Sequence, residues 1–245
     1  MHNANGSFDR ALALIPFSSS LLQSFFPPNL EFPTMATSFF HQPSSAFPAS
    51  ASPCRPRGTH AQPQPRSPAR VTLVQWTPPR FGWTKLNFDG SVYNDGSGRA
   101  SIGGAIRDVH GRVLLAFAER TPHAPIGIVE ARALARGLQL ALDFGCRRLL
   151  VEGDDLTLVR LLRCESRLTR IPREMEDEII GLLDSFEVCE VQHTYREGNF
   201  VADTLCKEAY RTAERKLWIE RGLPFAVWQK VEDDRCGVIH ERVRP

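Results

Sequence analysis

The feature that most constrains the fold of this 245-residue chain is an abrupt change of pattern near residue 80. Thirteen of the 18 prolines lie in residues 1–80, where serine and alanine are dense and no helical or alternating period is sustained. Such a segment cannot bury enough apolar surface to offset the entropy lost on ordering. We therefore expect residues 1–80 to be disordered and a folded domain to begin at residue 81.

Composition is compatible with one folded domain, because hydrophobic residues make up 42% of the chain and charged residues 24%. The net charge of +2 permits nucleic-acid binding without arguing for it. The six cysteines are scattered and form no C-x-x-C pair, so we expect free thiols in a reducing compartment. No apolar run reaches the roughly 18 residues of a membrane span, and we expect no membrane partner.

The N-terminal region contains a long stretch, residues 32–88, without a single acidic residue. The part that begins at Met35 is rich in serine and alanine and gains arginines late, a composition typical of organellar transit peptides. The residues before Met35 include Asp9 and Glu31, which fit that assignment poorly. Two alternatives stay open: a chloroplast transit peptide that starts at Met35, or a Pro/Ser-rich tail in a nuclear or cytoplasmic protein.

From residue 81 onward, strand and helix periods follow one another with clear turn signals between them. The expected strands are 83–93, 100–108, 112–119, 148–152 and 188–195, and the expected helices are 129–144, 155–164, 172–186 and 200–215. The first three strands form an antiparallel meander. The order βββαβααβα predicts an α/β fold with a mixed five-stranded sheet and helices packed on it. We expect this domain to span 81–210 and residues 211–245 to form a C-terminal tail.

Four acidic residues fall where a globular chain seldom places a solvated charge. Asp89 lies inside the first strand, where aspartate is depleted, and Glu130 heads the apolar stripe of the long helix. Asp154 follows the fourth strand, and Asp203 lies in the first turn of the last helix. Each has an ordinary alternative: a polar strand face for Asp89, an N-cap for Asp154, and a favourable helix dipole for the two helical acids.

As a set, the four acids converge if the first and fourth strands are neighbours at the centre of the sheet and both helices pack over the strand ends. Carboxylates gathered at one place repel one another and raise one another's pKa values, and divalent cations remove that cost. Mg²⁺ prefers oxygen ligands, so a carboxylate cluster without histidine or cysteine suits it. The set therefore predicts a Mg²⁺ site, with Mn²⁺ as a substitute.

The motifs around these acids resemble the plant-type, reverse-transcriptase-like branch of the RNase H family, which includes retroelement-type members. The matching segments are FDGS at 88–91, GGAIRD at 103–108, EARAL at 130–134, VEGD at 151–154, and HTYREGN at 193–199 followed by Ala202 and Asp203. The resemblance covers residues 81–210. Three positions depart from the family pattern: Gly153 stands where serine is usual, Cys206 stands where alanine is common, and Asp155 is an additional acid.

The resemblance implies an RNase H-like fold and an endonuclease that hydrolyses the RNA strand of an RNA–DNA hybrid, leaving 5′-phosphate and 3′-hydroxyl ends. It implies that two Mg²⁺ ions, roughly 3.5–4 Å apart in such sites, clamp the scissile phosphate. Their ligands are then the four acids, Asp89, Glu130, Asp154 and Asp203. His193 takes the place of a family histidine associated with product release or proton transfer, and its alternative is an ordinary packed strand histidine.

The resemblance also implies contacts with the hybrid, whose RNA strand is recognised largely through its 2′-hydroxyl groups. Gly90 and Ser91 follow the first acid and are expected to contact substrate. Asn199 is expected to contact the hybrid or to brace Asp203. Arg196 is expected to meet a phosphate, and a simple surface arginine is its alternative.

Three readings of function remain open at this stage. The first is an active hybrid ribonuclease, and the second is a nucleic-acid-binding module without turnover, such as a retroelement-derived remnant. The third is a nuclease of the same fold that acts on DNA. The segment between Asp154 and Asp203 has no basic extra helix, and no separate hybrid-binding domain is recognisable upstream, so we expect weak and salt-sensitive substrate binding. No obligate protein partner is indicated, and we expect a monomer.

Overall fold

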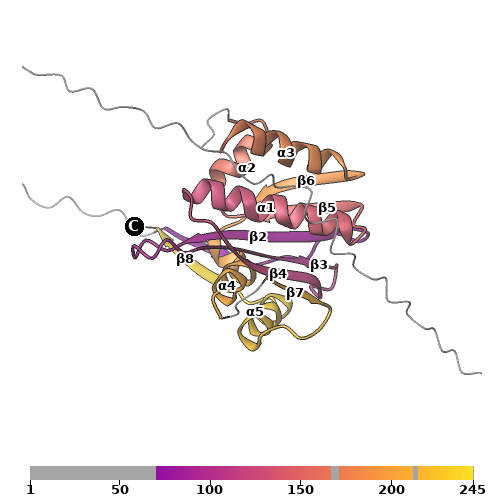
Figure 1. Ribbon diagram of the computed structural model, residues 1–245. Helices are drawn as coiled ribbons and strands as arrows, with labels where there is room; N and C mark the ends of the chain where they lie inside the picture. The colour runs from indigo at the N-terminus through magenta and orange to yellow at the C-terminus, as the bar shows by residue number, and fades with distance from the viewer. Residues whose placement is uncertain (1–69, 167–170, 212–214, 245) are drawn as a thin grey trace, which may run out of the picture. The chain divides into compact units, whose positions relative to one another are not determined.

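The computed structural model of the protein describes residues 70–166, 171–211 and 215–244 (Figure 1). Contacts divide the chain into residues 1–62 and 63–245, and all described residues belong to the second unit. The expected disorder and the transit-peptide alternative of residues 1–69 therefore lie outside the described residues. Among the helices that are described, none is long and apolar enough to cross a bilayer.

A mixed sheet in the order β6-β5-β2-β3-β4-β7 forms the centre of the domain. Its strands are β2 (Thr84–Val92), β3 (Ala100–Arg107), β4 (Val113–Thr121), β5 (Arg148–Gly153), β6 (Val188–His193) and β7 (Lys216–Ile219). The meander of β2, β3 and β4 is antiparallel, whereas β5 pairs parallel with β2 and β6 pairs parallel with β5. The expected α/β class and mixed sheet are confirmed, and β7 adds a sixth strand along β4.

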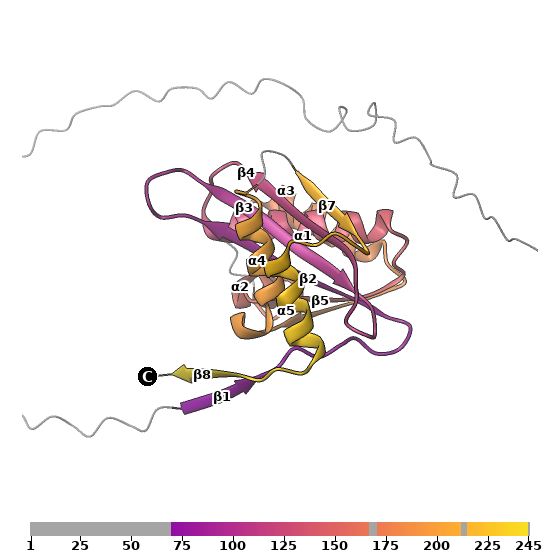
Figure 2. The ribbon, with the colours of Figure 1, turned by 90° about the horizontal axis from the view of Figure 1, so that it is seen from below.

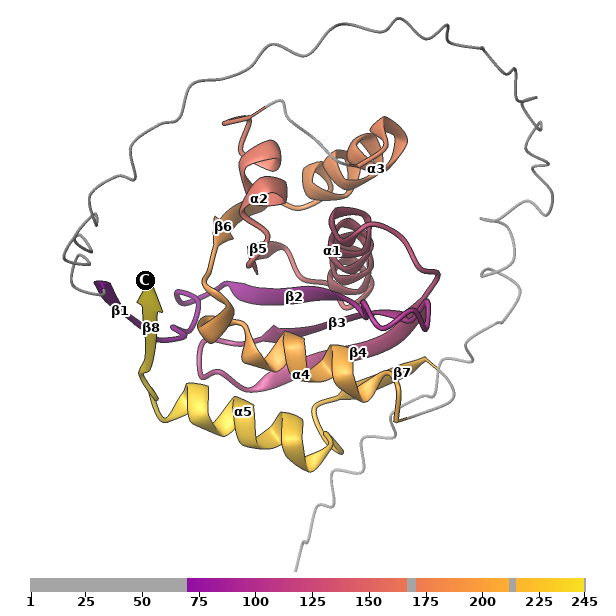
Figure 3. The same cartoon turned by 90° about the vertical axis from the view of Figure 1, so that its left-hand side faces the viewer.

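Helices cover both faces of this sheet (Figure 3). On one face lie α1 (Ile126–Asp143), α2 (Leu156–Leu162) and α3 (Arg173–Asp184), and on the other lie α4 (Phe200–Glu208) and α5 (Phe225–Arg235). Each face has its own apolar core: Leu134 and Leu138 of α1 are fully buried in one, and Leu205 of α4 and Val227 of α5 in the other. Burial of these two faces is the main favourable contribution to folding.

Two glycines let a helix from each face approach the sheet at the same place. A Cβ on Gly90 would lie 2.6 Å from the backbone nitrogen of Glu130 in α1. A Cβ on Gly103, which is the register partner of Asp89 across β2 and β3, would lie 2.6 Å from the backbone nitrogen of Cys206 in α4. Both helices therefore meet the sheet beside Asp89, which brings their acidic residues to one strand end.

The polar side of β2 is buried, although a solvated polar face was the ordinary alternative for this strand. Lys85 and Asn87 are 1% and 0% exposed. The Lys85 ammonium donates to Glu152 of β5 over 2.6 Å and to the Thr77 carbonyl over 2.6 Å, and Asn87 Nδ2 donates to Glu152 over 3.3 Å. This network holds β5 against β2, because a buried charge is tolerated only when it is paired and hydrogen-bonded.

A second buried ion pair connects the sheet to α5. The Arg107 guanidinium, fully buried, donates to Asp234 over 2.6 Å and to Asn87 over 2.7 Å. It also stacks on the Trp76 ring, 3.7 Å from the ring centroid, and the Trp76 indole nitrogen donates to Asn87. Residues on either side of the expected domain, Trp76 and Asp234, thus take part in its interior.

The structured region extends beyond the expected limits of 81 and 210 at both ends. Residues 70–80, expected in the disordered region, include β1 (Arg70–Val74), and residues 211–245, expected as a tail, include β7, α5 and β8 (His240–Arg244). Strands β1 and β8 pair with each other as a separate two-stranded sheet (Figure 2). These strands are only four or five residues long and depend on partners distant in sequence, so they show no period of their own.

Helix α4 ends at Glu208, earlier than the expected limit of 215. The chain turns after Ala209, and the Tyr210 ring packs edge-on against Tyr93 with centroids 5.1 Å apart. Residues 212–214 lie outside the described residues, and the chain then enters β7. The early end lets the chain return along β4.

Candidate metal centre

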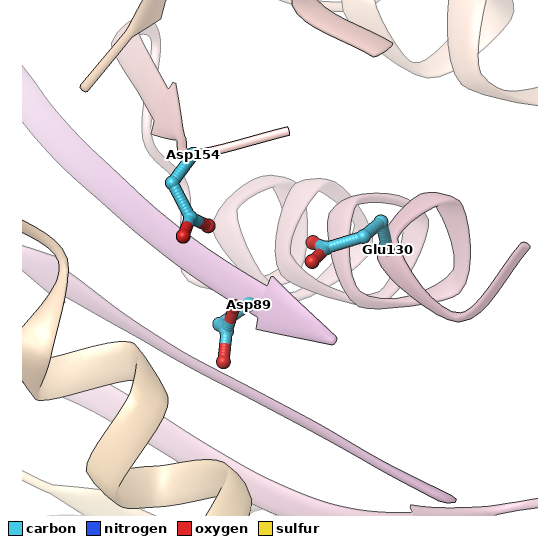
Figure 4. A group of neighbouring side chains, drawn as sticks. All are labelled: Asp89, Glu130 and Asp154. Carbon is cyan, nitrogen blue, oxygen red and sulfur yellow. The ribbon is translucent and has the colours of Figure 1, made fainter. Parts of the chain in front are cut away.

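Three of the four acids singled out in the sequence lie together at the end of the central strands (Figure 4). Asp89 comes from β2, Glu130 from the second turn of α1, and Asp154 directly follows β5. Each offers a carboxylate oxygen, and these oxygens all lie within 4.8 Å of one another. The parallel pairing of β2 with β5 and the close approach of α1 at Gly90 together produce this convergence.

The three carboxyl groups have raised pKa values. Burial, with a smaller contribution from the neighbouring Asp154 and Asp203 carboxylates, raises the pKa of Asp89 to about 8. Burial also raises the pKa of Glu130 well above its usual range, with Asp89 and Asp154 adding to the effect. Burial raises the pKa of Asp154 as well. Such a group of acids is poorly stable as three charges unless a cation joins it.

Asp203, the fourth acid, lies in the first turn of α4 and is 8% exposed. It contributes to the raised pKa of Asp89, so it faces the same region. Its two carboxylate oxygens accept from different cations: Oδ1 from the Arg196 guanidinium over 3.0 Å, and Oδ2 from the Lys207 ammonium. Asp203 is therefore neutralised by protein groups, whereas the other three acids form no ion pair with any of the described residues.

Asn199 connects the elements that carry the acids. Its Nδ2 donates to the Phe88 carbonyl of β2 over 2.8 Å and contacts Asp154 Oδ1 over 3.4 Å. The Phe88 carbonyl sets the orientation of the amide, since only the nitrogen can donate to it. The side chain is 1% exposed, and its Oδ1 is buried without a hydrogen-bond partner among the described residues.

The remaining residues singled out in the sequence lie around the cluster. The Gly90 backbone N–H donates to Glu130 Oε2 over 3.1 Å, which orients that carboxylate. Ser91 is the next residue of β2, partly buried and paired in register with Ser101. His193 ends β6 in register with Gly153, and its ring packs edge-on against Tyr195 at 5.4 Å. His193 therefore lies at the same end of the sheet as Asp154, where β5 and β6 both finish. It lies beside the cluster and not within it.

Each of the three departures from the family pattern has a local structural reason. A Cβ on Gly153 would lie 2.4 Å from the buried Phe88 ring, so serine does not fit here without movement. Asp155 is the N-cap of α2 and accepts from the Thr157 and Leu158 backbone N–H groups over 2.7 and 3.1 Å. The buried Cys206 thiol donates to the Asp89 carbonyl over 3.0 Å.

Lys207 is a site residue that the sequence analysis missed. It follows Asp203 by four residues, so helix geometry places the two side chains on one face, and this spacing was the available signal. Glu152 was also missed as a functional neighbour. Its pairing with Lys85 depends on strand register, which motif spacing does not reveal.

The fold and the site together define an RNase H-like α/β domain with a carboxylate cluster at the ends of its central strands. The model of the reverse transcriptase-like family matches residues 87–209. The chain belongs to this family, as the motif resemblance indicated.

Similar proteins carry ribonuclease H names. An Arabidopsis thaliana protein named "putative ribonuclease H protein" is 27% identical over 138 residues, which are 56% of this chain and 22% of the relative. The chain thus spans about a fifth of that relative's length. RNase H1 of the archaeon Halobacterium salinarum matches 53% of this chain and 98% of its own, with 26% identity and a TM-score of 0.49.

A further solved structure, LC11-RNase H1 in complex with an RNA/DNA hybrid, covers 51% of this chain and 95% of its own. Its sequence identity is 24% and its TM-score is 0.48. Because both superpositions stay below a TM-score of 0.5, the family assignment rests on the sequence match and on the observed topology.

Proposed function

We propose that this chain is an endonuclease that hydrolyses the RNA strand of RNA–DNA hybrids with two divalent metal ions. The observation that carries the proposal is the convergence of Asp89, Glu130 and Asp154 in a chain of the reverse transcriptase-like family. The ribonuclease H names of its relatives support the substrate class. We further propose that the protein acts as a monomer, without an obligate protein partner.

The residues at the site fit divalent cations of the Mg²⁺ type. All three clustered groups are oxygen donors, the ligands that Mg²⁺ and Mn²⁺ prefer. Their raised pKa values mean that a cation would relieve an existing electrostatic cost. The buried Oδ1 of Asn199 points to the same conclusion, because such an atom is costly unless a donor such as an ion's water reaches it.

In this proposal the chain's own residues hold and orient the reactants. When bound, the divalent cations supply Lewis-acid activation of water and neutralise charge on the phosphate. Asp89, Glu130 and Asp154 would hold the cations, and Asp203 would add a further carboxylate ligand on giving up its ion pairs. The Arg196 side chain is 66% exposed beside Asp203, so its guanidinium is free to turn toward a phosphate of the substrate.

The surrounding residues would handle the RNA strand and its products. Gly90 and Ser91 present backbone and hydroxyl groups next to Asp89, where 2′-hydroxyl groups of RNA could be bound. The Oδ1 of Asn199, unpartnered within the described part of the chain, would accept a hydrogen bond from the substrate or from a water bound beside it. His193, on the neighbouring strand end, assists proton transfer or product release after the phosphodiester bond is cut.

One observation favours the alternative of a nucleic-acid-binding module without turnover. Both oxygens of Asp203 are already paired with Arg196 and Lys207, so the fourth ligand of a two-ion site is occupied by protein cations. If these pairs persist with substrate bound, a second ion lacks a ligand. The ribonuclease and the binding module can be told apart by whether the bound RNA–DNA hybrid is cleaved.

The test presents one sequence as an RNA–DNA hybrid, a DNA duplex and an RNA duplex, each labelled on both strands, with Mg²⁺ at low salt. We expect cleavage of the RNA strand of the hybrid alone, with 3′-hydroxyl ends that a polymerase can extend. Binding of the hybrid without cleavage would establish the binding module. Cleavage of the DNA duplex would instead identify a DNA nuclease of the same fold.

A further inference from the structure

The two-stranded sheet of β1 and β8, here called the terminal strap, lies outside the family match of 87–209. Its register joins Val71 to Val243 and Val74 to His240 in an antiparallel ladder. Figure 2 shows the strap beside the domain, with β8 reached directly from α5. The family match thus gives no role for these two segments.

The strap packs against the short 3₁₀ helix η1 (Arg196–Gly198), which leads into α4. Arg242 of β8 donates to both carboxylate oxygens of Glu197, over 3.0 and 3.3 Å. The same guanidinium lies 4.8 Å from the centre of the Tyr195 ring. At the start of β8, His240 packs edge-on against Phe200 with ring centroids 5.0 Å apart.

The other residues of this loop point to the candidate metal centre. Arg196 pairs with Asp203, and Asn199 bonds the Phe88 carbonyl and contacts Asp154. Tyr195 and Glu197 therefore face the strap, whereas Arg196 and Asn199 contact the acids. The acids they contact are Asp203 and Asp154. The loop has only three residues of 3₁₀ helix and no side-chain cap, so little within it fixes its position.

The Arg242–Glu197 pair connects β8 of the strap to η1, the segment that carries Arg196 and precedes Asn199. The Arg242 side chain is 32% exposed and the Glu197 side chain 22%, so solvent screens this ion pair less than an ion pair at the open surface. One guanidinium nitrogen, Nη1, contacts both carboxylate oxygens, which restrains the position of the Glu197 carboxylate. Loss of either partner would free η1 on the side facing the strap.

We propose that the terminal strap positions the candidate metal centre, and that Arg242 is its positioning residue. Acting through Glu197 and Tyr195, Arg242 holds η1 so that Asn199 keeps its place between the Phe88 carbonyl and Asp154. The effect on divalent-ion affinity follows from this geometry, whereas the effect on cleavage rests on the proposed function. Strands β1 and β8, which lie outside the family match, then help to position the residues of the metal centre.

The test uses the full chain with three variants: Arg242→Ala, the isosteric Glu197→Gln, and the charge-swapped pair Glu197→Arg with Arg242→Glu. Arg147→Ala is the matched control, because Arg147 forms a comparable 3.0 Å pair with Glu187 and is 78% exposed. Three quantities are measured: hydrogen exchange of the Gly198, Asn199 and Asp203 amides, Mn²⁺ affinity, and hybrid cleavage. Exchange needs neither metal nor substrate, so it reports on the strap by itself.

We expect Arg242→Ala and Glu197→Gln to speed exchange at the loop amides and to weaken Mn²⁺ binding by about threefold to thirtyfold, the range typical of coupling through packed networks. The charge swap should recover most of both effects, and Arg147→Ala should change neither. Exchange and affinity within twofold of wild type in both single variants would overturn the proposal. Faster exchange with unchanged Mn²⁺ affinity, or no Mn²⁺ binding by wild type, would overturn the link to the metal centre.

A failure of the proposed function looks different. In that case wild type binds Mn²⁺ and leaves the hybrid uncut, while the strap variants still change exchange and Mn²⁺ affinity. If wild type does cleave, the strap predicts a lower kcat for Arg242→Ala at subsaturating metal and recovery at high metal concentration.

Discussion

At the scale of single residues, Asp203 is the acid whose state decides what the site can do. It is held by Arg196 and Lys207, while Asp89, Glu130 and Asp154 share one small region without such partners. Under the proposed two-ion mechanism, the three clustered acids would hold one ion, and a second ion would require Asp203 to exchange its protein cations for a metal ion. Binding of the two ions should consequently differ in affinity.

Replacing Lys207 with methionine should strengthen divalent-ion binding. The substitution keeps a long helix-forming side chain and removes one of the two cations that compete for Asp203. Because the Lys207 side chain is 58% exposed, the gain is modest, about twofold to fivefold for an exposed pair. Calorimetric titration with Mn²⁺ measures it, with Lys207→Arg as the charge-retaining control. Weaker binding by the methionine variant would contradict this account of Asp203.

Gly153 gives a second prediction at this scale, because serine is usual there in the family. Gly153→Ser should destabilise the fold by about 1–3 kcal/mol, the usual cost of overpacking a core. The physical reason is the 2.4 Å approach of the new Cβ to the Phe88 ring. Denaturant unfolding measures the change, and Gly181→Ser on α3, where a Cβ meets nothing within 4 Å, is the control. Equal stability of the two variants would count against this packing.

The sequence identified the clustered acids because each interrupts a local pattern: Asp89 in a strand, Glu130 on an apolar stripe, and Asp154 at a strand end. It did not reveal that Asp203 is neutralised or that Asn199 bridges β2 and the residue after β5. Those facts depend on side-chain conformations across elements that are distant in sequence. Spacing alone could have suggested only the Asp203–Lys207 pair.

At the scale of elements, α5 is fixed to the sheet by one buried ion pair. Helix α5 buries only Val227, Val231 and Asp234, so it has little apolar surface with which to hold its position. The Arg107–Asp234 pair reaches from this helix to β3, and Arg107 stacks on Trp76. The pair therefore secures segments on both sides of the family match.

Asp234→Ala should destabilise the protein by about 3–5 kcal/mol, because it leaves the fully buried Arg107 charge without its acidic partner. Asp233→Ala is a matched control one residue earlier, since the Asp233 side chain is 31% exposed and pairs with Lys230 of the same helix. Thermal and denaturant unfolding of both variants measure the difference. The prediction fails if the two substitutions cost the same.

Helices and strands with a clear hydrophobic period in their own sequence were predicted closely. Those without such a period were not predicted. Helix α1 follows its Leu134, Leu138 and Ala141 stripe, and the meander follows its turn signals. Strands β1, β7 and β8 are short and acquire strand geometry only by pairing with partners far along the chain. The hydrophobic period within so short a segment does not reveal pairing with a distant strand.

At the scale of the whole molecule, the buried acids make stability depend on pH and on divalent cations together. The pKa of Asp89 is raised from 3.8 to about 8 in the folded state, so the folded protein binds a proton that the unfolded chain releases. This contribution to stability is fully present below about pH 4 and is lost as pH rises through 8. Across that window the slope for one proton is about 1.4 kcal/mol per pH unit.

We therefore expect the metal-free protein to lose stability between pH 5 and 8, and Mg²⁺ to stabilise it more at pH 8 than at pH 5. Asp89→Asn should flatten the metal-free profile and remove most of the Mg²⁺ effect. Unfolding free energies measured across this pH range, with and without Mg²⁺, provide the comparison. A pH profile unaltered by the substitution would show that Asp89 does not titrate as the structure indicates.

We propose that the carboxylate cluster makes this chain a metal-dependent hybrid ribonuclease. The most direct test is cleavage of a labelled RNA–DNA hybrid by wild type and by Asp89→Asn, as Mg²⁺ is titrated at low salt. We predict Mg²⁺-dependent cleavage by wild type and a loss of about a thousandfold in the variant, since metal stabilisation of the reacting phosphate is worth several kcal/mol. A folded wild-type protein that leaves the hybrid intact in both Mg²⁺ and Mn²⁺ would contradict the claim.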